Sequence, residues 1–147
     1  MKKTENKAIK ITEPQKNSLR TSLTILERTF DEIERLCTAK DKIGELYENI
    51  NDFSEQERIL LIKKIASIRK YIAYLKIKLN LPKERISTKR TISSHLAGLW
   101  EIGCELESKR LKGYGAIDNS LKEVSDPVVK RIIQLLSESS DILMRKK

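Results

Sequence analysis

The chain has 147 residues, of which 39% are hydrophobic and 35% are charged, and its formal net charge is +9 at pH 7. Five glycines and three prolines are too few for the many turns of an all-β chain, and the apolar content is too high for global disorder. This balance is typical of helices that combine a narrow apolar stripe with a charged outer face.

The composition also argues against export, membrane insertion and metal binding. The first residues are charged, and the longest aliphatic run, residues 59–62, is far shorter than a membrane span. Cys37 and Cys104 lack CxxC spacing, and with a single histidine they are too few for a metal site. We therefore predict a cytoplasmic chain with free thiols, no cofactor and no membrane association.

In chain order, we expect residues 1–12 to form a mobile basic arm and residues 13–147 to form a single helical-bundle domain. The first predicted helix runs from about 14 to 50 and begins near Pro14, which is well suited to a first helical turn. Its apolar residues recur at alternating intervals of four and three, the spacing of one helix face. They are Leu19, Leu23, Leu26, Phe30, Ile33 and Cys37.

The second predicted helix covers residues 55–80, between a capping box of Ser54 and Glu57 and the stop at Pro82. Its short link to the first helix predicts a long antiparallel hairpin. The helix has two apolar lines, and the second line needs a neighbour, which can be another helix of the chain or a second copy in a homodimer. The main line is Leu61, Ile65, Ile68, Ile72, Leu75 and Leu79, and the second is Ile59, Ile62, Ala66, Ala73 and Ile77.

Two shorter helices are expected in the remaining sequence. One begins near Ser87 or Thr88 and ends at about 110, and the other begins at Asp126, with Pro127 in its first turn. The inner face of the former consists of Ile92, Leu96, Leu99, Gly103 and Leu106. Four helices without strands predict an all-α four-helix bundle.

Positive charge is concentrated in residues 58–92, where eleven basic residues face one carboxylate. One face of the second helix is a candidate site for nucleic acid or another anion, since ammonium groups attract phosphates and tyrosines stack on bases. The residues of this face are Lys63, Lys64, Lys70, Tyr74 and Lys78. The favoured interpretation is structural, in which acidic side chains of residues 21–57 neutralise Arg58, Arg69 and Lys76 of the second helix. These acidic residues are Glu27, Asp31, Glu34, Glu45 and Glu48.

The string of residues 109–115 is a second candidate anion site, formed by Lys109, Arg110, Lys112 and Tyr114 beside two glycines. Its alternative interpretation is a helix end, in which basic side chains favour the C-terminus and Gly113 takes a left-handed capping conformation. The two interpretations are compatible, because a capping loop can also bind a partner.

Arg90 and His95 have R-x4-H spacing, which resembles the short motif of HEPN-type ribonucleases, a family of small helical bundles. The resemblance covers six residues, with Thr91 where that family usually has Asn, Asp or His, and it implies ribonuclease activity. Five positions on one continuous helix place the two side chains about 140° apart. We therefore expect His95 to be a partly buried, hydrogen-bonded residue and not a catalytic one.

Three classes of function follow from these patterns. The favoured class is a non-enzymatic helical interaction or adaptor module that acts through protein–protein contacts, including a homodimer. The alternative is a sequence-nonspecific nucleic-acid-binding protein that uses the basic face and the 109–115 string. A HEPN-like ribonuclease is the third.

Overall fold

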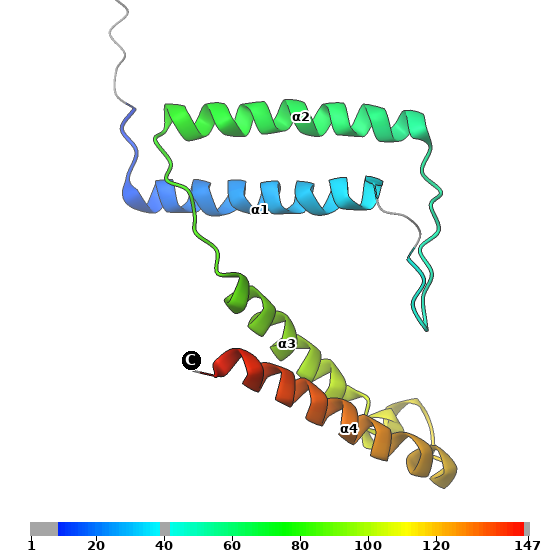
Figure 1. The fold of residues 1–147 in the computed structure, drawn as a ribbon. Helices are drawn as coiled ribbons and strands as arrows, with labels where there is room; N and C mark the ends of the chain where they lie inside the picture. The colour runs from blue at the N-terminus through cyan, green and yellow to red at the C-terminus, as the bar shows by residue number, and fades with distance from the viewer. Residues whose placement is uncertain (1–8, 39–41, 146–147) are drawn as a thin grey trace, which may run out of the picture. The chain divides into compact units, whose positions relative to one another are not determined.

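The computed structural model describes residues 9–38 and 42–145, and the elements in these ranges are helices (Figure 1). They are α1 (Glu13–Thr38), α2 (Glu55–Lys78), α3 (Thr88–Glu105), the 3₁₀ helix η1 (Ser108–Tyr114) and α4 (Asn119–Met144). The described ranges contain no strand, only an isolated bridge between Ile43 and Glu48. The all-α fold class is therefore confirmed. No helix in these ranges is long and apolar enough to cross a membrane.

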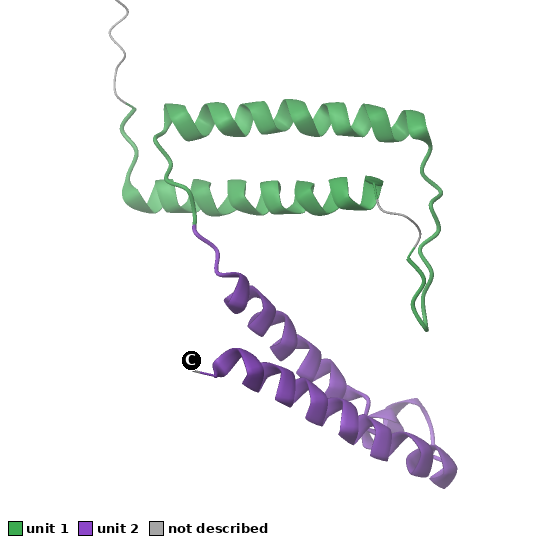
Figure 2. Cartoon of the chain, viewed as in Figure 1, with its two compact units in different colours: residues 1–84 green, residues 85–147 purple. Residues whose placement is uncertain are grey.

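The chain divides into two compact units, residues 1–84 and 85–147 (Figure 2). The first contains α1 and α2, and the second contains α3, η1 and α4. The four-helix bundle and the domain limits concern the whole chain and stay predictions. Most of the predicted basic arm, residues 1–8, lies outside the described residues.

The first helix is shorter than predicted, because α1 ends at Thr38 and not near residue 50. After the undescribed residues 39–41, the backbone turns back on itself, with the Gly44 N–H donating to the Tyr47 carbonyl at 2.8 Å. A Cβ atom at Gly44 would meet the Tyr47 ring, so glycine allows this close approach. Glycine also has a low helix propensity, so the apolar spacing through residues 43–50 is not supported by the local sequence.

The ends of α2 follow local sequence signals. The predicted capping box is confirmed, because the Glu57 N–H donates to Ser54 Oγ at 3.1 Å and the Ser54 N–H donates to Glu57 Oε1 at 3.3 Å. At the other end, Asn80 takes a left-handed φ of 51°. The Leu81 N–H then donates to the Lys76 carbonyl, a Schellman end that buries Leu81 against the unit.

Within the first unit, α1 and α2 run antiparallel and side by side (Figure 1). Ile65 and Ile72 of α2 are buried, and Ile65 is only 1% exposed. The centre of the apolar stripe therefore lies on these two residues, whereas Ile68, at its edge, is 38% exposed. The side chain of Arg69 joins the helices through Asp31 at 2.8 Å and Glu34 at 3.2 Å.

Within the second unit, α3 and α4 pack side by side in antiparallel directions (Figure 1). The two helices are in tight contact at Gly103, where an added Cβ would lie 3.3 Å from Ile133 Cγ1 and 3.4 Å from Leu136 Cδ1. The α-helix ends at Glu105 and not at residue 110, and residues 108–114 form η1 instead. The prediction that Gly113 takes a left-handed conformation is wrong, because its φ is not positive. The glycine with positive φ is Gly115, at 140°.

The last helix begins earlier than predicted, because α4 starts at Asn119 and its N-cap is Asp118. The Asp118 carboxylate accepts from the Ser120 N–H at 2.7 Å. Pro127 therefore lies inside the helix, and Asp126 is not a cap. Its carboxylate instead accepts two hydrogen bonds from Ser108, a tertiary contact that the dipeptide Asp-Pro does not indicate.

Candidate functional site

The predicted basic face of α2 lies on the surface of the first unit. All of its residues are exposed, and its lysines form no ion pair with a described residue. Its residues are Lys63, Lys64, Lys70, Tyr74 and Lys78. The predicted neutralisation by α1 occurs at Arg69, whereas Arg58 pairs with Glu55 of its own helix. Anion binding by this face stays a prediction.

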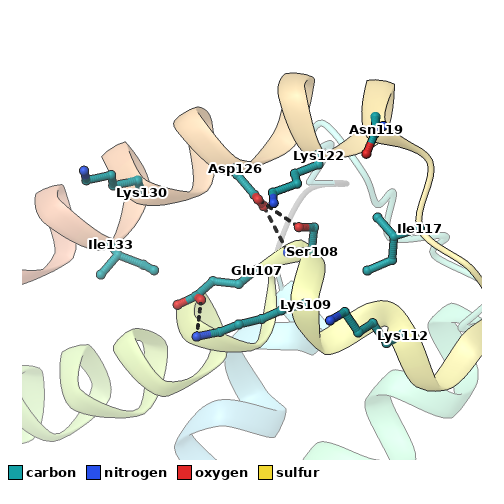
Figure 3. Close-up of a pocket in the computed structure, with 10 residues that line it drawn as sticks. All are labelled: Glu107, Ser108, Lys109, Lys112, Ile117, Asn119, Lys122, Asp126, Lys130 and Ile133. Atoms are coloured by element: carbon teal, nitrogen blue, oxygen red, sulfur yellow. Dashed lines mark hydrogen bonds and ion pairs between the residues drawn. The ribbon is translucent and has the colours of Figure 1, made fainter.

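Of the four residues predicted as an anion site in the 109–115 string, two line a cavity and two do not. Lys109 and Lys112 line a cavity of about 700 Å³ between η1 and α4 (Figure 3). Arg110 and Tyr114 are not among its lining residues, and Tyr114 is 92% exposed. We name this cavity the η1–α4 pocket. It is lined by Glu107, Ser108, Lys109, Lys112, Ile117, Asn119, Lys122, Asp126, Lys130 and Ile133.

The pocket is held together by Ser108 and Asp126. The Ser108 N–H donates to Asp126 Oδ1 at 3.0 Å, and the hydroxyl donates to Oδ2 at 2.8 Å (Figure 3). Ser108 is buried at 3% exposure. These two hydrogen bonds, together with the charge of nearby Lys122, lower the pKa of Asp126, so the carboxylate is ionised at neutral pH.

Four lysines surround this pocket, from both of its elements. Lys109 forms an ion pair with Glu107 at 3.0 Å. The other three lysines, Lys112, Lys122 and Lys130, form no ion pair with a described residue. The lining therefore carries four ammonium groups against two carboxylates.

The sequence interpretation missed Ser108, Lys122, Asp126 and Lys130. The last three share one face of α4 because they are spaced by four residues. That face could have been found if Asp118, which is a good N-cap residue, had been chosen as the helix start in place of Asp126. The contact with Ser108 is eighteen residues distant and has no local signal.

Arg90 and His95 both lie in the single continuous helix α3, as the geometric argument against the HEPN motif assumed. His95 is exposed, and its ring forms no hydrogen bond with a described residue. The expectation of a partly buried, hydrogen-bonded histidine is therefore wrong. Of the predicted inner face of α3, Leu96 is half-buried and Gly103 is buried, whereas Ile92, Leu99 and Leu106 are exposed.

An uncovered apolar line runs along α4 within the second unit. Its residues are spaced by seven and are between 43% and 60% exposed: Leu121, Val128, Leu135 and Ile142. The inner face of the same helix is formed by Val129, which is buried, with half-buried Ile133 and Leu136. The α4 apolar line thus lies on a different side of the helix from the inner face, because neighbours such as Val128 and Val129 are about 100° apart on a helix.

Cys37 and Cys104 are half-buried free thiols. Among residues 9–38 and 42–145, no group of three or more His, Cys, Asp or Glu side chains is placed to hold a metal ion. No protein-family model, curated protein or solved structure matches the chain. Function is therefore inferred from the surfaces and the pocket described above.

Proposed function

We propose that the chain is a non-enzymatic helical interaction module that self-associates through the α4 apolar line. The observation that supports this proposal is the exposure of Leu121, Val128, Leu135 and Ile142 on one helix that already has a separate inner face. Large contiguous apolar patches are uncommon on monomeric proteins and mark interaction sites.

A second copy of the chain is the partner that best matches this line. A seven-residue repeat of apolar side chains is one of the two apolar positions of a coiled-coil heptad. In α4 the other position is apolar at Val124 and charged at Arg131 and Glu138. A two-fold axis brings the same patch of each copy into contact, so an apolar patch is complementary to itself. The flanking residues Arg131 and Glu138 have opposite charges and lie 3.8 Å apart, and in an antiparallel pair each can also meet its opposite on the partner.

Sedimentation of the full chain at micromolar concentration tests the proposal. We expect a dimer for the wild type and a monomer for the V128E/L135E double variant, because two carboxylates would then be buried at the interface. Both side chains are exposed within the unit, so the helix content in circular dichroism should be retained. The control is S137E, which places a carboxylate at an exposed residue on the opposite side of α4 from the line. A monomeric wild type would refute self-association.

The exposed lysines of α2 support a second candidate function, sequence-nonspecific nucleic-acid binding. Their ammonium groups are not occupied by described carboxylates, so they can contact a phosphate backbone. Binding of labelled duplex DNA should weaken in K63Q/K70Q and with added salt, but not with a change of DNA sequence. The matched variant K83Q/K89Q removes the same charge elsewhere. Absence of binding at low salt would eliminate this function.

A further inference from the structure

The η1–α4 pocket has an excess of positive charge that its own carboxylates do not remove. Glu107 is paired with Lys109, and Asp126 accepts both hydrogen bonds of Ser108. Lys112 extends its ammonium group from η1 toward the other lining side chains, and the ammonium group of Lys122 lies beside Asp126, whereas that of Lys130 points away from them (Figure 3). An anion that enters the pocket would therefore meet lysines without an ion-pair partner among the described residues.

The size and chemistry of the pocket restrict the anion. Its volume of about 700 Å³ is in the range of small-molecule sites. Ile117 and Ile133 supply an apolar surface, and no aromatic side chain is among the lining residues. A nucleobase would thus find no stacking partner, whereas an aliphatic body would be covered. Several lysine ammonium groups at one site suit a phosphate monoester, which carries a charge of about −1.5 to −2 at neutral pH, better than a singly charged carboxylate.

We propose that the η1–α4 pocket binds a phosphate monoester attached to a short aliphatic body. Lys112 and Lys122 would contact the phosphate oxygens, and the aliphatic part would lie against Ile117 and Ile133. This inference is independent of self-association, because the pocket and the α4 apolar line lie on different faces of the helix.

The pocket has features of a preorganised site. The two hydrogen bonds between Ser108 and Asp126 fix η1 against α4 across eighteen residues of sequence. The walls thus need little ordering when a ligand binds, which lowers the entropic cost of binding. An adjoining hollow shares Lys122 and Lys130 and adds Pro127 and Glu123. Glu123 would repel an anion there, so the phosphate is expected on the η1 side.

The test is a titration of the full ¹⁵N-labelled chain with hexyl phosphate, inorganic phosphate and hexanol. We expect saturable shifts confined to η1 and the first half of α4, with hexyl phosphate binding more tightly than either fragment. K112Q/K122Q should weaken hexyl phosphate binding by roughly tenfold or more, the effect of losing a charged hydrogen bond. K83Q/K89Q, which removes two exposed lysines outside the pocket, should leave the affinity unchanged.

Three outcomes would overturn the proposal: no saturable binding of hexyl phosphate, equal weakening in both double variants, or shifts spread over the basic face of α2. Vesicles distinguish the two sources of the phosphate. Binding to phosphatidic acid vesicles, and not to phosphatidylcholine vesicles, would assign a lipid headgroup. Binding of hexyl phosphate without binding of either vesicle would assign a soluble phosphate ester, and both results support the pocket.

Discussion

The two units are both antiparallel helix pairs with few buried side chains, but they are joined in different ways. In the first unit, charges on α1 and α2 meet at Arg69, and the lysines on the outer face of α2 remain unpaired with described residues. In the second unit, α3 and α4 approach closely at Gly103, and Ser108 and Asp126 tie η1 to α4 around a pocket. The first unit therefore offers an exposed basic surface on α2. The second unit offers a pocket, whose walls are joined by a hydrogen-bonded pair that is distant in sequence.

The largest effect is expected at the core of the first unit. I65D places a carboxylate at a residue that is 1% exposed, and we expect a loss of about 3–5 kcal/mol, which approaches the whole stability of a small domain. The matched variant I68D lies one turn away at 38% exposure and should cost much less. Chemical unfolding followed by circular dichroism measures both. Equal losses would show that the stripe is centred elsewhere.

The contact between α3 and α4 at Gly103 predicts a smaller change in the stability of the second unit. G103L should destabilise the unit by about 1–3 kcal/mol, because its side chain would overlap Ile133 and Leu136. G98L is the control in the same helix, since nothing lies within 4 Å of a Cβ added there. It should stabilise the unit by about 1 kcal/mol through helix propensity. Fluorescence of Trp100, the single tryptophan, reports unfolding of this unit. Destabilisation by both variants would contradict the helix contact.

The fold could be predicted where the signals are local. Ser54 and Glu57 cap α2, and Ser87 caps α3, because such hydrogen bonds join residues three apart. The end of α1 at Thr38 was missed, because the apolar spacing continues past Gly44 although the backbone does not.

The candidate site could be predicted only in part, for a related reason. Lys109 and Lys112 were identified because they cluster in the sequence, and they do line the pocket. Lys122 and Lys130 belong to a helix whose start was misplaced, and Asp126 was assigned to a cap because Asp-Pro usually begins a helix. Its actual partner, Ser108, depends on how η1 folds back on α4.

The tie between Ser108 and Asp126 predicts a dependence on pH in the second unit. The hydrogen bonds from Ser108 hold the pKa of Asp126 below its ordinary value in the folded unit, and unfolding restores that value. The stabilisation is therefore fully present above the ordinary pKa and is lost as the pH falls through the lowered one. Trp100-monitored stability of the wild type should decrease more than that of D126N in this acidic range. E123Q, an exposed neighbour, should follow the wild type, and identical profiles for all three would argue against the tie.

The smallest effect is expected for the ion pairs that join α1 and α2. R69Q removes contacts with Asp31 and Glu34, and because these groups are partly exposed to solvent the loss should be only about 0.5 kcal/mol. K70Q removes the neighbouring charge, which forms no ion pair with a described residue, and should change stability less or increase it by reducing repulsion among the lysines of α2. Measuring both variants by chemical unfolding at low and at 1 M salt separates the two roles, because the difference between them should shrink as salt screens the charges. If R69Q were no more harmful than K70Q at low salt, the charges of α1 and α2 would contribute nothing to their pairing, and the first unit would depend on its apolar contacts alone.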